Sequence, residues 1–215
     1  HGNWVMSSSG LEQPVFFASG PRRLEGRLRL SDGPNAVLVT HPHPLYGGNL
    51  DNPVVAALIE CYHQQGYTTL RFNFRGVGRS EGHYADGVGE REDVRAAAAY
   101  LTDLGKTVSD LAGYSFGAWI NLSLQPTLAT LRRQLAVAPP VALLDFSAVS
   151  HLPAELSVIV GDRDEFAPLE RVQALLPRWH PSARLRVVPG ADHFYQTTLN
   201  RLRTTLADVL LTTAD

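Results

Sequence analysis

Short apolar runs alternate along the chain with longer segments whose apolar residues recur every three or four positions. The first pattern is typical of buried strands, and the second is typical of helices that cover a sheet with one face. Strand-like runs occupy residues 36–40, 67–74, 107–114, 134–138, 156–161 and 183–188. Helical spacing follows most of them, over residues 53–62, 94–104, from 115 onward, 169–176 and 199–210. The alternation predicts an α/β fold, with a mostly parallel doubly wound sheet covered on both faces.

The N-terminal part of the chain has a different pattern of hydrophobic and polar residues. Two β-like runs, VFFAS and RLEGRLRL, lie between Val15 and Leu30 and are separated by Gly20 and Pro21. Close spacing around a turn predicts an antiparallel strand pair that opens the sheet. The first helix is expected to follow a cap at Asp51 or Asn52, with Pro53 in its first turn.

Length and composition bound the organisation of the chain. With 215 residues, 44% of them hydrophobic and 19% charged, it fits one sizeable core. We expect one α/β domain over residues 6–215, because residues 1–5 precede the only methionine, Met6, and resemble a cloning remnant. The N-terminus lacks the order of a signal peptide, and no apolar stretch is long enough for a membrane span.

Charge and cysteine content limit the classes of partner and the cellular compartment to be expected. The formal charge is −2, the isoelectric point is about 6.5, and no basic stripe is visible, so we expect no nucleic-acid partner and no membrane partner. A lone Cys61 excludes an intrachain disulfide and fits a reducing, cytoplasmic location. A secreted protein without disulfides would show the same cysteine content.

Candidate chemistry follows the carboxyl ends of the predicted strands, which converge at one edge of such a sheet. The stretch LAGYSFGA places Ser115 between Gly113 and Gly117, directly after a strand and before a helix. Small neighbours permit a tight turn that exposes a nucleophilic Oγ. The stretch VVPGADHFY places His193 after the last strand, where its imidazole could take the serine proton.

A carboxylate that orients the histidine is available from the stretch VIVGDRDEFAP. Asp162 and Asp164 both follow the preceding strand, and the residue pattern alone leaves both open. The order Ser, Asp, His along the chain is the one found in α/β-hydrolases, in contrast to other folds that carry the same triad.

A fourth loop, THPHPLYGGNL, could complete an oxyanion hole together with the backbone N–H of Phe116. Proline has no N–H, which leaves His43 as the first choice of donor and Leu45 as the second. The pair His41 and His43 also allows a metal site, but no Cys or carboxylate cluster accompanies it. We therefore expect no metal and no cofactor.

Five motifs in order, HPHPLYGGNLDN, RFNFRGVGRSEG, GYSFGA, GDRDEFAP and GADHFY, resemble those of the small, lidless bacterial α/β-hydrolases over roughly residues 15–213. The resemblance implies that Ser115 is the nucleophile and His193 the base. It implies Asp164 as the acid, because the family pattern G-x-x-D-x-x-x-P is reproduced by Gly161, Asp164 and Pro168. Most characterised relatives are carboxylesterases or have no known substrate.

The expected function is therefore that of a cofactor-free serine hydrolase that cleaves small carboxylic esters through an acyl-enzyme. Alternatives are a non-catalytic binding module with this fold, and a thioesterase, amidase or carbon–carbon hydrolase that uses the same triad. Residues 139–155 are too few for a multi-helix lid, which predicts an open site. Residues 76–82 are expected at the rim of the site, with Arg75 in a structural role.

Overall fold

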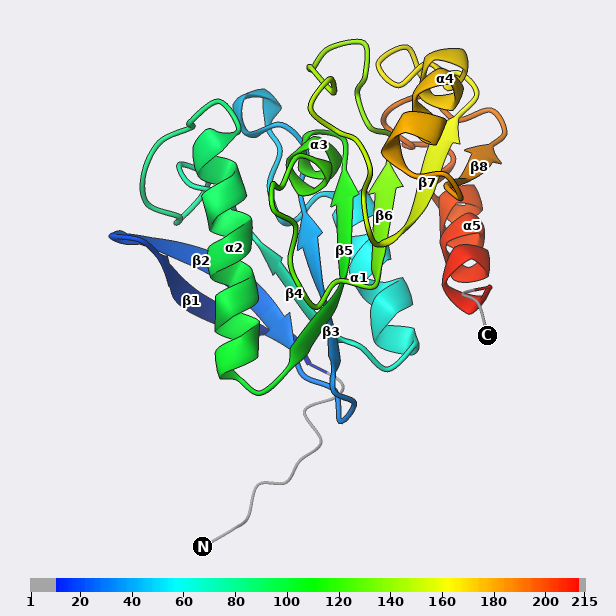
Figure 1. Ribbon diagram of the computed structural model, residues 1–215. Helices are drawn as coiled ribbons and strands as arrows, with labels where there is room; N and C mark the ends of the chain where they lie inside the picture. Colours follow the sequence, from blue (N-terminus) through cyan, green and yellow to red (C-terminus); the bar gives the residue numbers. More distant parts are fainter. Residues whose placement is uncertain (1–10, 213–215) are drawn as a thin grey trace, which may run out of the picture.

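The computed structural model describes residues 11–212, and in them one eight-stranded sheet has the order β1-β2-β4-β3-β5-β6-β7-β8 (Figure 1). The cloning remnant expected at residues 1–5 lies outside the described residues. The strands are β1 (Gln13–Ser19), β2 (Arg22–Arg29), β3 (Asn35–Thr40), β4 (Thr68–Phe72), β5 (Thr107–Tyr114), β6 (Arg133–Val137), β7 (Glu155–Gly161) and β8 (Arg184–Val188).

Strand directions agree with the sequence-based prediction. β1 and β2 form an antiparallel hairpin, and β2 pairs with β4 antiparallel as well. Every other pairing, from β4 through β3 and β5 to β8, is parallel. The predicted fold class, a mostly parallel sheet that begins with an antiparallel pair, is confirmed.

Helices cover both faces of this sheet (Figure 1). α1 (Pro53–Gln64) packs against α5 (Leu199–Leu211) on one face, and α2 (Val88–Asp103) lies with α3 (Phe116–Leu122) on the other. α4 (Leu169–Trp179) lies at the β7–β8 end. Each face has its own core: one contains Val55, Leu58 and Leu206, and the other contains Val94 and Phe116.

The cap of α1 shows how local chemistry sets an element boundary. Of the two predicted caps, Asn52 is the one used, and its Oδ1 accepts hydrogen bonds from the N–H groups of Val54 and Val55 at 2.8 and 3.4 Å. Pro53 follows at the first helical position, where its missing N–H costs nothing. This cap fixes the end of the loop that follows β3.

The sequence pattern did not reveal the 3-10 turn η1 (Pro44–Tyr46), which folds the loop between β3 and α1. The N–H of Leu45 donates to Nδ1 of His43 at 3.1 Å and caps the turn. A single short turn carries no apolar periodicity, so the pattern of hydrophobic residues could not reveal it.

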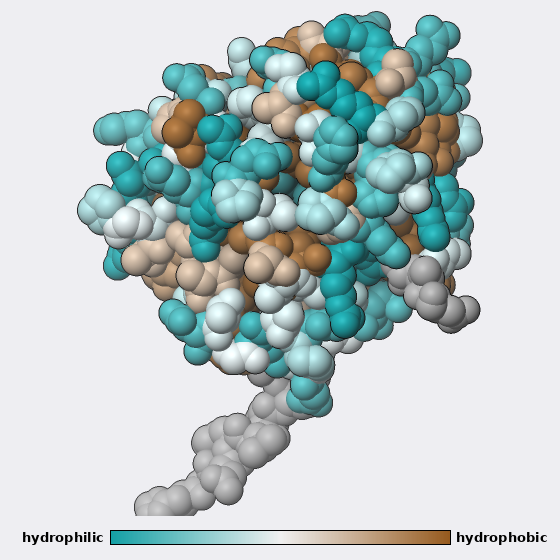
Figure 2. Space-filling model, viewed as in Figure 1, coloured by the Kyte–Doolittle hydropathy of each residue, from teal (hydrophilic) through white to brown (hydrophobic). Residues whose placement is uncertain are grey.

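The carboxyl ends of the parallel strands lie at one end of the sheet, and the end of α5 and the start of β1 lie toward the other (Figure 1). Hydrophobic residues on the face drawn in Figure 2 form patches that hydrophilic residues interrupt. None of the helices within residues 11–212 combines the length and the hydropathy that crossing a bilayer requires.

Candidate active site

Ser115 occupies a sharp turn between β5 and α3. Its backbone has φ 56° and ψ −116°, a region that non-glycine residues rarely adopt. A Cβ on Gly113 would approach the backbone N of Ala118 to 2.6 Å, and one on Gly117 would approach the carbonyl oxygen of Thr40 to 2.5 Å. The flanking glycines therefore permit the turn, and the turn holds the serine in a strained conformation that points Oγ at the pocket.

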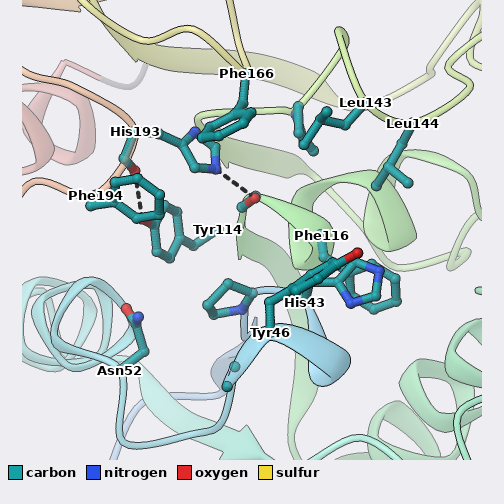
Figure 3. Close-up of a pocket in the computed structure, with 15 residues that line it drawn as sticks. His43, Tyr46, Asn52, Tyr114, Phe116, Leu143, Leu144, Phe166, His193 and Phe194 are labelled. Carbon is teal, nitrogen blue, oxygen red and sulfur yellow. Dashed lines mark hydrogen bonds between the residues drawn. The ribbon is translucent and has the colours of Figure 1, made fainter.

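Two hydrogen bonds join Ser115 to His193 and His193 to Asp164. Ser115 Oγ lies 2.8 Å from His193 Nε2, the contact drawn as a dashed line in Figure 3, and His193 Nδ1 lies 2.8 Å from Asp164 Oδ2. A carboxylate can only accept from Nδ1–H, which leaves Nε2 free to accept the serine proton. All three side chains are buried.

The environment of Asp164 fixes its carboxylate. Its second oxygen, Oδ1, accepts hydrogen bonds from the N–H groups of Phe166 and Ala167 at 2.8 and 2.7 Å. The alternative acid, Asp162, is exposed, and its Oδ1 accepts from the N–H of Gly190 at 2.8 Å. Of the two aspartates that the residue pattern left open, the structure thus brings Asp164, the one that the family resemblance implied, to the imidazole. Asp162 is turned away and caps a turn.

The loop that carries His193 is fixed by its neighbours. The hydroxyl of Tyr114 donates to the carbonyl oxygen of His193 at 2.6 Å. Burial raises the pKa of Tyr114 well above the usual tyrosine value, and the charges of Asp164 and Asp192 raise it further, so the hydroxyl keeps its proton. Oδ1 of Asp192 accepts from the N–H groups of Phe194 and Tyr195. The imidazole therefore sits on a rigid backbone.

His43 and Phe116, the predicted oxyanion-hole residues, lie side by side at the pocket, with ring centroids 4.7 Å apart. Within residues 11–212 the backbone N–H of neither residue has a hydrogen-bond partner. The N–H of Leu45, the second choice, is already bonded to Nδ1 of His43. Burial lowers the pKa of His43, which favours the neutral ring that this bond requires.

His41 has no free nitrogen to offer a metal. Its Nδ1 donates to the carbonyl oxygen of Pro42 at 2.6 Å, and its Nε2 accepts from the N–H of Phe74 at 3.0 Å. In the part of the chain that the structure describes, no group of three or more His, Cys, Asp or Glu side chains is arranged to hold a metal ion. The side chain of His41 instead ties the end of β3 to the segment after β4.

A cavity of about 650 Å³ opens above Ser115. Part of its apolar wall lies outside the four loops that the sequence motifs placed at the site. Leu143 and Leu144, from the segment between β6 and β7, lie on the far side of the pocket from Phe194 and Tyr114 in Figure 3. The remaining lining residues are Pro42, His43, Tyr46, Gly47, Gly48, Asn52, Phe116, Pro140, Phe166 and His193.

Residues 76–82, expected near the rim of the site, do not line this cavity. They pack against β2 instead: the N–H of Glu81 donates to the carbonyl oxygen of Arg23, and the Glu25 carboxylate accepts from the backbone N–H of Arg79. The structural role expected for Arg75 agrees with its buried ion pair with Asp93, whose atoms lie 2.9 Å apart.

Comparison with known proteins places these features in context. The chain is 33% identical to an α/β serine hydrolase homologue from Coxiella burnetii, with 92% of this chain and 97% of that one covered and a TM-score of 0.83. It is 31% identical to a lidless α/β serine hydrolase from Xanthomonas campestris, with coverage of 96% and 98% and a TM-score of 0.83. An uncharacterized protein of Rickettsia prowazekii is 36% identical over 212 residues, which are 93% of this chain and 89% of that protein. No protein-family model matches the chain.

Proposed function

The chain belongs to the lidless α/β-hydrolases, and on that premise we propose that it hydrolyses small carboxylic esters through an acyl-enzyme intermediate. In this proposal Ser115 is the nucleophile, His193 the general base and acid, and Asp164 the carboxylate that orients His193. The backbone N–H groups of His43 and Phe116 form the oxyanion hole. No cofactor takes part.

In the first half-reaction, Ser115 Oγ attacks the ester carbonyl carbon while its proton passes to His193 Nε2. The charge of Asp164 stabilises the imidazolium that results. The carbonyl oxygen becomes an oxyanion and accepts hydrogen bonds from the N–H groups of His43 and Phe116. The bond between the carbonyl carbon and the alcohol oxygen then breaks, and His193 Nε2–H gives its proton to the departing alcohol.

In the second half-reaction, water attacks the acyl-enzyme and loses a proton to His193 Nε2. A second oxyanion forms in the same hole. Its collapse releases the carboxylic acid and returns the proton to Ser115 Oγ. The net change is one ester and one water converted to one acid and one alcohol.

The observation that carries the proposal is the chain of two 2.8 Å hydrogen bonds from Ser115 through His193 to Asp164, at the floor of an apolar cavity. A serine that only forms a turn needs no histidine nitrogen within hydrogen-bond distance of its Oγ. It also needs no carboxylate that orients such a histidine. We place the protein in the cytoplasm, since its single cysteine, Cys61, is a buried free thiol. We propose that it acts on small molecules and not on nucleic acid or membranes, in keeping with its formal charge of −2.

Labelling with a fluorophosphonate probe, followed by peptide mapping, tests the nucleophile. We expect the adduct on Ser115, and we expect Ser115→Ala to lose both the label and roughly 10³-fold or more of the turnover of small activated esters. Ser182→Ala, at an exposed serine before β8, is the matched control and should retain both. An adduct on another residue, or an active Ser115→Ala protein, would overturn the assignment.

A further inference from the structure

Three rings gather on one side of the candidate nucleophile. The centroids of Phe166 and Phe194 lie 4.9 and 5.4 Å from that of His193, both edge-on, and 5.9 Å from one another. Both phenylalanines line the cavity, and Figure 3 shows them beside the imidazole. The histidine is therefore flanked by aromatic carbon on its pocket side.

The position of His193 Nε2, the proton donor, identifies which part of the substrate these rings would contact. In the proposed reaction His193 Nε2 gives its proton to the alcohol oxygen of the ester, which must come within about 3 Å of that nitrogen. Because both phenylalanine rings pack against this imidazole, a group attached to the alcohol oxygen can extend toward Phe166 and Phe194. The aromatic wall is thus on the side of the departing alcohol.

Phe194 is 56% exposed, yet its backbone is fixed. Its N–H donates to Oδ1 of Asp192 at 2.9 Å, and the neighbouring carbonyl of His193 accepts from Tyr114. A large ring held at a cavity mouth by a rigid loop is already organised to bind, because little conformational entropy is lost when a ligand packs against it.

The opposite wall has a different chemistry. Leu143 and Leu144 face the pocket across from Phe194 and are aliphatic, and the rings of Tyr46 and Phe116 also line the cavity away from Phe194 (Figure 3). Among the described residues that line the cavity there is no Lys, Arg, Asp or Glu. One side therefore suits a flat aromatic group and the other a short aliphatic group, and neither offers a charged partner to an ionic substituent.

We infer that the preferred substrates are uncharged esters whose alcohol part carries an aromatic ring that packs against Phe194 and Phe166, with the acyl part against Leu143 and Leu144. The inference rests on the proposed ester hydrolysis. It adds the substrate class and assigns Phe194 as a specificity-determining residue.

Two isomeric esters test the assignment. Benzyl acetate carries its ring on the alcohol side, and methyl phenylacetate carries the same ring on the acyl side. We expect Phe194→Ala to lower kcat/KM for benzyl acetate about 3- to 10-fold more than for methyl phenylacetate, chiefly through KM, as expected for loss of an aromatic pair. Phe194→Trp should keep the wild-type ratio of the two constants, and Phe194→Leu, which keeps the bulk without the ring, should not.

Matched controls separate this effect from a general loss of fold. Leu143→Ala should lower kcat/KM for methyl phenylacetate more than for benzyl acetate. Leu104→Ala removes an exposed apolar side chain at the other end of the sheet and should leave the ratio as it is. Equal losses on both isomers in Phe194→Ala, or a larger loss on methyl phenylacetate, would overturn the inference. Failure of the unaltered protein to hydrolyse any ester would instead overturn the proposed function.

Discussion

Strand β5 carries one buried polar network in its first half and a second directly after its end, and the two differ in what their central group can do. Near its start, Asp110 accepts hydrogen bonds from Arg133 Nε at 2.6 Å and from the hydroxyl of Tyr62 at 3.0 Å. Just after its end, Ser115 meets His193, which is backed by Asp164. Both networks contain a buried carboxylate with a nitrogen partner less than 3 Å away.

The difference lies in the partner and in access. The guanidinium of Arg133 keeps its charge at every physiological pH, and neither Arg133 nor Asp110 lines the active-site cavity. His193 can take up and release a proton, and it faces a cavity of about 650 Å³. A buried carboxylate thus serves the fold where its partner is a fixed cation, and can serve chemistry where its partner exchanges protons beside space for a substrate.

The largest expected effect comes from breaking the second network at its carboxylate. We expect Asp164→Asn to lower kcat on the order of 10⁴-fold, because an amide no longer dictates the tautomer of His193 or stabilises its cation. Steady-state kinetics on a small activated ester measure this. Asp162→Asn is the matched control and should have a much milder effect. If Asp162→Asn were instead the crippled variant, Asp164 would not be the acid.

Breaking the first network should affect stability and not chemistry. Asp110→Asn leaves the buried guanidinium of Arg133 without its counter-charge, and we expect a loss of about 3–5 kcal/mol in the free energy of unfolding. Urea denaturation measures it. Adding Arg133→Met should recover part of the loss, because no uncompensated charge then remains buried. A loss below about 1 kcal/mol in the single variant would mean that this pair contributes little.

A third buried group, His41, sharpens the comparison, because it is a histidine with a structural role. It is fully buried, and this burial lowers its pKa to about 4; repulsion from His43 adds to the shift, and the hydrogen bond to Pro42 opposes it. The unfolded chain, with a value of about 6.5, binds the proton first as the pH falls. Stability from this group is therefore complete above about pH 6.5 and is lost progressively down to about pH 4.

Over that window we expect the loss to reach about 3 kcal/mol, from the difference between the two pKa values. Denaturation curves at several pH values measure it, with His41→Gln as the comparison, since an amide does not titrate. The stability of His41→Gln should depend less steeply on pH between about 4 and 6.5. Identical slopes in the two proteins would show that His41 does not contribute.

The smallest expected effect concerns the length of the acyl chain. Each buried CH₂ contributes up to about 0.8 kcal/mol only where a wall exists to cover it, so we expect optimal acyl groups of about two to six carbons. The specificity constants for p-nitrophenyl esters of increasing length, below and above their aggregation point, measure this. A maximum at about ten carbons or more, or a jump on aggregation, would mean that another segment covers the site.

Much of the fold follows from the sequence because its pattern repeats. Buried strands alternate with helices of regular spacing, so the parallel sheet and the N-terminal hairpin could be predicted, with boundaries displaced by one or two residues. The same repeating pattern predicted the order along the chain of the loops that carry Ser115, Asp164 and His193. Their catalytic roles remain a proposal.

The parts that could not be predicted depend on side-chain direction. The residue pattern alone left Asp162 and Asp164 open, and Asp164 could be chosen only through the family resemblance. The folded backbone turns Asp164 toward His193 and Asp162 toward Gly190. Leu143 and Leu144 lie in an irregular segment that has no periodicity, so no pattern indicated that they line the cavity. Loops place their residues through tertiary contacts that local sequence does not encode.

Both ends of the described chain lie at the opposite end of the sheet from the strand ends that carry the candidate triad (Figure 1). A protein tethered to a solid support near either end would therefore present its cavity to the surrounding liquid and not to the support. Substrate would reach the immobilised protein by free diffusion, and a fused carrier domain at either end would leave that approach open.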